Sequence, residues 1–506
     1  MQTTKLSLLL LIFTAAASGF HLSALYQNGM VLQAGHATVW GFKDGHQQFV
    51  TADIACILKN GDNYEESQLF SLNNEEENEF FFYYFEFEEG TKCDITFMQD
   101  GEDYVIPLLD VHFGDVWICS GQSNMEWRID SIFNADEEVA SMAEYYNFKM
   151  FRLPHMTSDK RQDDLLDKTR TWTGTSDIDL VKPFSAVCLL TAKYMADVLG
   201  KDKVFGLIET TWGGTRIEAW MPPEALEVCG IADNIDENNP QNSNSYLYNA
   251  MIHPLVRMDI KGALWYQGEA NAGWNRDDYQ CTFPSMIESW RSTWAQFSST
   301  SFKFPFGFMQ LATTKAADTD VSNPQFPVIR WHQTADFGYV PNDVLQDVFM
   351  GVSLDTYDEE SGIHPRNKQL PSSRLASAGL NVAYGLKEYP DNGPRPATVN
   401  FNPLEEEIQV EVLYDQDFTW NEAETNGFSY CCEADLTACN AKFGTWINVE
   451  SVSVNGRAIS TVIPACSVGF GYLWKTVPVL GTEALPIYAA NAFKLPASPW
   501  IWNVTI

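Results

Sequence analysis

The spacing of apolar residues divides the chain into three stretches with different predicted structures. Residues 20–105 carry short strand-like segments with no helical period, which predicts a β domain. Residues 106–395 combine strand-like runs with helical spacing, as at Ala186–Leu199, which predicts an α/β domain. Strand-like segments such as Glu407–Tyr414 return in residues 396–506, so we expect a second β domain there.

Two apolar runs of the middle stretch end in polar loops that contain glycine. These runs are Phe205–Ile208 and Gly262–Tyr266. In a parallel sheet the loops that follow the carboxyl ends of the strands converge on one edge, which is where binding and catalytic sites form. The pattern therefore predicts a site at this edge.

The composition is that of a globular protein with a strongly acidic surface. The 506-residue chain holds 67 acidic and 32 basic residues, which gives a formal net charge of −35. Such a surface repels phosphate groups, which argues against nucleic acid or an anionic membrane as a partner. The length favours two to four domains.

The amino terminus has the features of a secretory signal peptide. Lys5 precedes an apolar core from Leu6 to Ala17, and small residues follow as far as Gly19. We therefore expect cleavage after residue 19 and a mature chain that enters the secretory pathway, with the lysosomal lumen or secretion as its end point. The core is too short to span a membrane, and no later apolar run reaches the length of about 18 residues that a spanning helix needs.

Ten cysteines in a secretory chain indicate disulfides. Cys431, Cys432 and Cys439 lack the spacing of a zinc site and have no nearby histidine, so we expect a disulfide staple there. Cys119 lies in an apolar run and could be a buried free thiol. The sequon at Asn503–Thr505 predicts a glycoprotein. Metal-binding and nucleotide-binding motifs are absent from the sequence, so we expect no metal and no cofactor.

Ser123 is the candidate nucleophile because it follows the run Val111–Ile118 at a turn that leads into a helix. A serine at this place has its hydroxyl at the carboxyl end of a strand and a free backbone N–H that can receive an oxyanion. His364 is the candidate base, since it lies in a loop between a strand and a helix-like stretch, and His253 is the nearest alternative.

Four ordered blocks around these residues resemble the sialate O-acetylesterase family of SGNH-type hydrolases. The blocks are Gly121–Met125, Thr211–Trp220, Trp265–Asn271 and Ile363–Gln369. Similar stretches at Asn28–Gln33 and Tyr430–Cys432 extend the resemblance over nearly the whole mature chain. The resemblance implies a three-layer α/β/α, flavodoxin-like catalytic domain flanked by N- and C-terminal β-sandwich-like domains. It also implies that a serine esterase removes O-acetyl groups, at the 9-O or 4-O position, from a sialoglycan substrate through an acyl-enzyme.

The resemblance assigns roles to residues within the matching blocks. It makes Ser123 the nucleophile and His364 the base. The residues implied at the oxyanion hole are Gly214, Gln267 and Asn271. The residues expected to contact the substrate are Gln122, Asn124, Arg216, Glu269 and Arg366.

One position departs from the family pattern. SGNH hydrolases usually place an aspartate three residues before the histidine, and this chain has Ser361 there. Asp355, Asp358 or Glu360 could orient the imidazole instead, as could a backbone carbonyl or a water molecule. We predict that Asp358 does so.

An anionic substrate such as sialic acid needs a local cation on so acidic a protein, and Arg216 and Arg366 are the candidates. An imidazole with the ordinary pKa of about 6.5 is mostly protonated at lysosomal pH, so we expect faster turnover near neutral pH.

Three alternatives remain at this point. The same chemistry could act on another acetylated glycan such as xylan, or the chain could be a catalytically inactive glycan-binding relative. Glu269 with Asp115 or Glu126 would suit a glycosidase, but paired carboxylates carry little weight in a chain with 67 acidic residues. The oligomeric state stays open.

Overall fold

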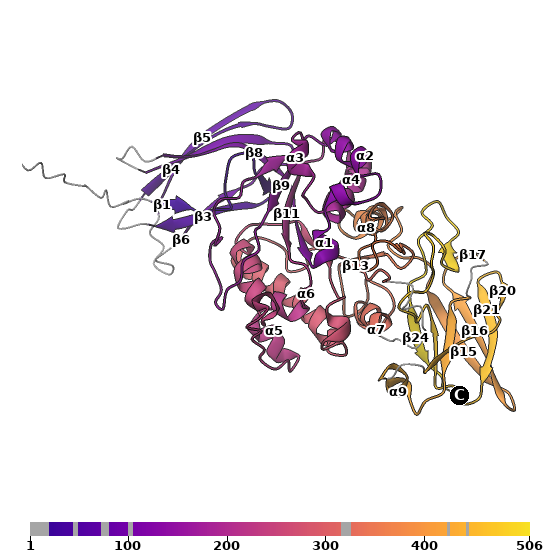
Figure 1. The fold of residues 1–506 in the computed structure, drawn as a ribbon. Helices are drawn as coiled ribbons and strands as arrows, with labels where there is room; N and C mark the ends of the chain where they lie inside the picture. Colours follow the sequence, from indigo (N-terminus) through magenta and orange to yellow (C-terminus); the bar gives the residue numbers. More distant parts are fainter. Residues whose placement is uncertain are drawn as a thin grey trace, which may run out of the picture.

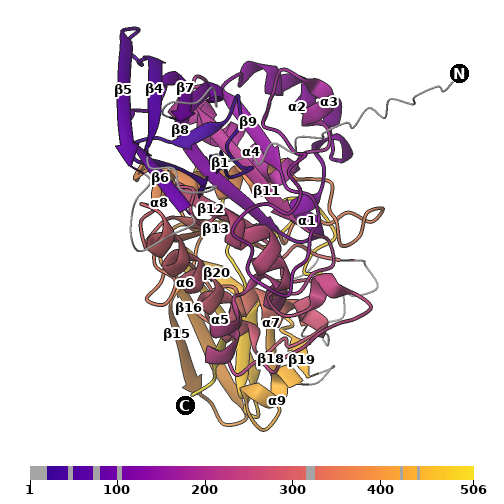
Figure 2. The same ribbon diagram turned by 90° about the vertical axis from the view of Figure 1, so that its left-hand side faces the viewer.

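The computed structural model describes residues 20–43, 49–71, 80–99, 105–314, 325–421, 426–441 and 445–505. The predicted signal peptide lies outside these residues. Figures 1 and 2 show the N-terminal strands and the C-terminal β region at opposite ends of the molecule, with the α/β part between them. Within the described ranges, no helix is both long and apolar enough to cross a membrane.

A mostly parallel sheet forms the centre of the molecule. Its strands lie in the order β10-β9-β11-β8-β12-β13-β14, and only the β10–β9 pair is antiparallel. The bounds are β8 Val105–Gly121, β9 Phe148–Arg152, β10 Thr173–Gly174, β11 Phe205–Thr211, β12 Gly262–Tyr266, β13 Phe306–Gln310 and β14 Val348–Val352. The strands β11 to β14 are buried along their whole length, as expected when both faces of a parallel sheet are covered.

Strand β8 connects the central sheet to the N-terminal strands. Its first half pairs with β7 as far as His112, and from Asp115 onward it pairs with β11 and β12. The predicted boundary between residues 105 and 106 therefore falls at the start of one continuous strand, and the division into domains stays a prediction. The N-terminal strands are β1 Phe20–Leu22, β2 Val31–Gln33, β3 Ala37–Lys43, β4 Phe49–Ile57, β5 Asn63–Ser71, β6 Phe80–Phe85 and β7 Lys92–Gln99.

The helix predicted at Ala186–Leu199 is confirmed with these bounds, as α4. The Ser185 hydroxyl caps it by accepting the N–H of Cys188, and Gly200 ends it with a φ of 121°. Among the described residues the remaining α-helices are α1 Ser123–Glu126, α2 Ala135–Ser141, α3 Ile178–Val181, α5 Pro223–Val228, α6 Tyr279–Phe297, α7 Gln325–His332, α8 Gln369–Val382 and α9 Leu436–Ala441.

Helices cover both faces of the central sheet (Figure 1). Trp265 of β12 packs against Trp290 of α6, with ring centroids 5.8 Å apart. Leu264, the preceding residue, points to the opposite face and is in register with Phe349 of β14 through β13. The Phe349 ring lies 3.0 Å from the position that a methyl group would occupy at Gly379 of α8, so α8 packs closely on this second face.

The C-terminal region contains antiparallel sheets, and the strand expected at Glu407–Tyr414 is confirmed as β16. The pattern of buried and exposed residues alternates strictly along β16, which leaves one face for the core and one for solvent. The strands are β15 Pro396–Pro403, β16 Glu407–Tyr414, β17 Phe418–Trp420, β18 Phe428–Cys431, β19 Trp446–Asn448, β20 Ser453–Asn455, β21 Ala458–Pro464, β22 Gly469–Tyr472, β23 Ile487–Ala489 and β24 Trp500–Asn503.

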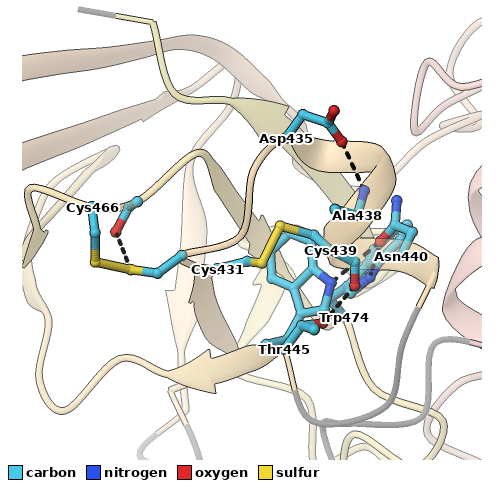
Figure 3. Close-up of a disulfide and its surroundings, with 11 residues drawn as sticks. Cys431, Asp435, Ala438, Cys439, Asn440, Thr445, Cys466 and Trp474 are labelled. Carbon is cyan, nitrogen blue, oxygen red and sulfur yellow. Dashed lines mark hydrogen bonds between the residues drawn. A yellow bond between two sulfur atoms is a disulfide. The ribbon is translucent and has the colours of Figure 1, made fainter.

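All ten cysteines lie in five disulfides. The expected C-terminal staple is confirmed, because Cys431 bonds to Cys439 and the adjacent Cys432 bonds to Cys466 (Figure 3). The suggestion that Cys119 is a free thiol is wrong, since it bonds to Cys188 and so joins β8 to α4. The other two disulfides are Cys56–Cys93 and Cys229–Cys281.

Candidate active site

Ser123 lies at the carboxyl end of the central strand of the sheet. Strand β8 ends at Gly121, and α1 begins at Ser123 after a single intervening residue. Gly121 has a φ of 137°, and a Cβ there would lie 2.2 Å from the carbonyl oxygen of Tyr266. Only glycine fits this backbone and this contact, so the sequence determines the tight turn that presents the serine.

His364 reaches Ser123 from the loop that follows β14. Its Nε2 lies 2.8 Å from the Ser123 hydroxyl oxygen, and its ring stacks on Trp127 with centroids 4.8 Å apart. Burial and the positive charge of Lys368 lower the pKa of His364, so the neutral imidazole that can accept a proton is favoured. The alternative base, His253, is turned toward the carbonyl of Gln162 instead.

The acids near the histidine loop are held by arginines. Burial opposes ionisation of Asp358, but hydrogen bonds from Arg366 and the backbone lower its pKa to about 2. Glu360 pairs with the same arginine, and Asp355 pairs with Arg374. Among the described residues none of these three carboxylates hydrogen-bonds to His364. The orienting role predicted for Asp358 is therefore not carried by a direct contact.

Two backbone N–H groups near Ser123 have no acceptor within the described residues. They belong to Ser123 itself, at the start of α1, and to Gly214, whose φ is 73°. The N–H of Gly213 is used differently, because it donates to the Glu126 carboxylate at 2.8 Å. Gly213 packs directly on the serine, since a Cβ on this glycine would lie 3.2 Å from the Ser123 Cβ.

The amides of Gln267 and Asn271 are buried beneath this turn and are fully used. Gln267 donates to the carbonyl of Thr215 and to the Asn271 side chain, at 3.1 and 2.7 Å. Asn271 donates to Glu218 and to the carbonyl of Trp274. Because both protons of each amide are taken, these side chains support the residues that follow Gly214. Their expected place at the oxyanion hole stays a prediction.

Gln122 and Asn124 flank the serine and point into the protein. The Gln122 side-chain oxygen accepts the N–H groups of Gly268 and Ala270, so it fixes the loop after β12. Asn124 donates to Glu269 at 2.5 Å and accepts a hydrogen bond from Lys368 at 2.5 Å. Both side chains are almost fully buried, so their main effect is to fix the loops that form the site.

The two candidate cations differ in their surroundings. Arg366 is paired with Asp358 and Glu360. Arg216 forms no salt bridge with any described residue, and its guanidinium lies 3.8 Å from the centroid of the Trp274 ring. Arg216 follows Gly214 by two residues, and its positive charge acts on the Glu218 carboxylate, where it opposes the rise in pKa that burial causes.

The sequence did not reveal a second cluster of polar side chains near Ser123, which consists of Glu126, His155 and Arg152. His155 lies 2.9 Å from Glu126 and stacks on Trp212 at 4.3 Å, and Arg152 contacts the same carboxylate. Sequence reasoning also gave no role to Lys368, which is 1% exposed. Its position four residues after His364, inside a recognisable block, was the available signal.

Comparison with known families defines the class of this protein. Residues 113–335 match the family model described as carbohydrate esterase, sialic acid-specific acetylesterase. Residues 399–504 match the model of the sialate O-acetylesterase C-terminal domain. The protein is an esterase of the carbohydrate esterase class.

Individual relatives narrow the class to one family. The sialate O-acetylesterase of Homo sapiens is 33% identical over 99% of this chain and 96% of its own length. That of Mus musculus is 32% identical over 97% of this chain and 96% of its own length. The chain belongs to the sialate O-acetylesterase family.

A solved structure supports the fold over the same extent. A carbohydrate acetylesterase from Xanthomonas citri has a TM-score of 0.76 and 24% sequence identity, and the alignment covers 96% of this chain and all of that protein. The likeness includes the N-terminal strands, the central α/β part and the C-terminal sheets.

Proposed function

We propose that this protein removes O-acetyl groups from sialic acids by a Ser123–His364 mechanism. The observation that carries the proposal is the 2.8 Å contact between the Ser123 hydroxyl and His364 Nε2. Membership of the sialate O-acetylesterase family supports the substrate class. The central sheet with helices on both faces supports an SGNH-type, three-layer catalytic domain.

The reaction follows from the positions of these groups. The neutral imidazole takes the Ser123 proton while the serine oxygen attacks the acetyl carbonyl. The N–H groups of Ser123 and Gly214 receive the developing oxyanion, and removing one such donor costs about 3 to 4 kcal/mol. His364 then gives this proton to the departing sugar oxygen, which leaves as a hydroxyl. A water molecule that loses a proton to the same ring attacks the acetyl-serine carbonyl, which releases acetate and restores the serine.

Arg216 supplies the cation that the substrate requires. The carboxylate of a sialic acid can form charge-assisted hydrogen bonds with a guanidinium that forms no salt bridge to a described residue. The ring of Trp274, which is 40% exposed, forms an apolar surface behind this arginine. An acetyl group on the glycerol side chain or ring of the sugar, at the 9-O or 4-O position, would then enter beside Ser123.

The five disulfides and the absence of a spanning helix in the described ranges fit a lumenal or secreted protein. Residence in the lysosome or outside the cell, with a glycan on Asn503, belongs to the same proposal.

Acetate release from a 9-O-acetylated sialoside and from acetylated xylan tests the proposal, with the wild type and a folded Ser123→Ala protein. We expect the wild type alone to release acetate from the sialoside. Acetate release from xylan only would support the proposed ester hydrolysis but would assign it to a different glycan substrate. Binding of the sialoside without release, by a folded wild type, would identify an inactive glycan-binding relative.

A further inference from the structure

A buried lysine, Lys368, contacts the side chain of the residue that follows Ser123. Lys368 is 1% exposed, and its ammonium donates a hydrogen bond to Asn124 Oδ1 at 2.5 Å. It also lies 5.3 Å from the centroid of the Tyr266 ring at the end of β12. A lysine is almost never buried so completely without a specific partner, because burial removes its ammonium from water.

Asn124, in the helix that begins at Ser123, joins this lysine to two loops of the site. Its amide nitrogen donates to Glu269 Oε1 at 2.5 Å and to the carbonyl of Ile363 at 2.9 Å. Asn124 is adjacent to Ser123, and Ile363 is adjacent to His364. One side-chain amide therefore ties the helix that bears the serine to the loop that bears the histidine, and Lys368 occupies its remaining acceptor.

The charges around this group act on the imidazole. Among the described residues the charged group that shifts His364 is Lys368, and it lowers the pKa of the ring together with burial. Lys368 itself faces Glu269 and Asp358, yet burial dominates and lowers its pKa to about 7. Burial raises the pKa of Glu269, whose second oxygen has no hydrogen-bond partner within the described residues.

We propose that Lys368 is a positioning residue of the esterase site: through Asn124 it holds the histidine loop against the serine, and it places a positive charge near the imidazole. It thereby contributes to the fixed geometry that an aspartate at position 361 would otherwise supply. The proposal rests on the Ser123–His364 mechanism. Lys368 acts through Asn124 and through its charge, without touching the reacting atoms.

Replacement of Lys368 by methionine tests the proposal in the full-length protein. Lys368→Met keeps the apolar stem and removes both the charge and the hydrogen bond to Asn124. We expect kcat to fall by about 10-fold or more, as for a loss of orientation, with KM changed less than about 2-fold. Without the nearby charge, the acidic limb of kcat/KM should move to higher pH.

Lys203→Met is the matched control. Lys203 is also largely buried and ion-paired, with Asp115 and Glu89, but it precedes β11 at the opposite end of the sheet from Ser123. This variant should lose stability and keep the wild-type pH profile. The proposal fails if both variants change the profile alike, or if folded Lys368→Met keeps the wild-type kcat and acidic limb.

A second variant covers the case in which Lys368→Met does not fold. Lys368→Gln keeps a donor for Asn124 without the charge, so it should move the acidic limb while it loses less kcat than the methionine variant. The pKa of His364, followed by NMR titration of the imidazole in wild type and variant, gives a readout that needs no activity. An unchanged His364 pKa overturns the proposal. Loss of the proposed function itself is seen separately, as a wild type without esterase activity or a Ser123→Ala protein that retains it.

Discussion

At the scale of single residues, the two arginines near Ser123 have opposite electrostatic situations. Arg366 is neutralised by Asp358 and Glu360 and stacks on Phe133, with the guanidinium 4.7 Å from the ring centroid. Arg216 has the Trp274 ring beneath it and forms no salt bridge with a described residue, although its charge acts on the buried Glu218. An anionic substrate therefore gains more from Arg216, because no existing ion pair must be broken.

We expect Arg216→Ala to raise KM for an acetylated sialoside by about 10-fold or more, since a hydrogen bond to a charged group contributes about 1.5 to 3 kcal/mol. Hydrolysis of an uncharged acetyl ester should be nearly unchanged, because that substrate has no carboxylate. Steady-state kinetics on both esters checks this. An equal loss on both would place Arg216 in the support of the Gly214 turn instead of in the recognition of the anion.

The pH dependence follows from the direction of the His364 shift. The imidazole must be neutral to accept the Ser123 proton, and burial with the Lys368 charge lowers its pKa from 6.5. The base therefore stays active as the pH falls below 6.5 and is lost only at the lowered pKa. We expect the acidic limb of kcat/KM to lie below pH 6.5, which extends activity from neutral into mildly acidic solution. A limb at or above pH 6.5 in a pH–rate profile would contradict this.

Ser123 and His364 could be proposed from the sequence because local context made each a candidate, a glycine turn after a buried run and a loop after a strand, and the family resemblance then assigned their roles. The hydrogen-bond partners of Asp358, Gln267 and Asn271 could not be predicted from the sequence. A carboxylate or an amide can serve catalysis or structure, and the choice depends on which donors and acceptors the fold brings within about 3 Å. Arg366 donates a hydrogen bond to Asp358, and the Gln267 amide donates one to the Asn271 side chain.

At the scale of elements, the sequence predicts an end of a helix or strand when nearby residues determine it, and fails when pairing with distant strands determines it. The bounds of α4 follow from Ser185 and Gly200, which act within one turn of the helix ends. The length of β8 could not be predicted from its own sequence, because Pro107 and Asp110 suggest a break in the strand. Asp110 indeed has a φ of 57°. The strand continues because β7 pairs with its first half while β11 and β12 pair with its second half.

The disulfide between β8 and α4 gives a prediction for these elements. Cys119 and Cys188 are 69 residues apart, so the bond restricts a long loop of the unfolded chain. The double variant Cys119→Ala/Cys188→Ala should lose about 2 to 4 kcal/mol of unfolding free energy. Urea unfolding measures this loss. An unchanged midpoint would mean that this bond contributes nothing beyond the packing of α4 on the sheet.

At the scale of the whole molecule, the net charge of −35 opposes the approach of any anionic substrate. This repulsion acts over distances that salt screens well, since the Debye length is about 10 Å at 0.1 M ionic strength. The attraction of Arg216 acts at contact, where screening is weak. Added salt therefore removes more repulsion than attraction.

We expect kcat/KM for an acetylated sialoside to rise with ionic strength, through faster association, while that for an uncharged acetyl ester stays constant. The rise should persist in Arg216→Ala at a lower absolute value, because the repulsion comes from the whole surface and the attraction from one side chain. Stopped-flow or initial-rate measurements between low and physiological salt check this. If the sialoside rate falls with salt instead, the field at the carboxyl edge of the sheet is positive, and Arg216 with Arg152 outweighs the acidic surface even at long range.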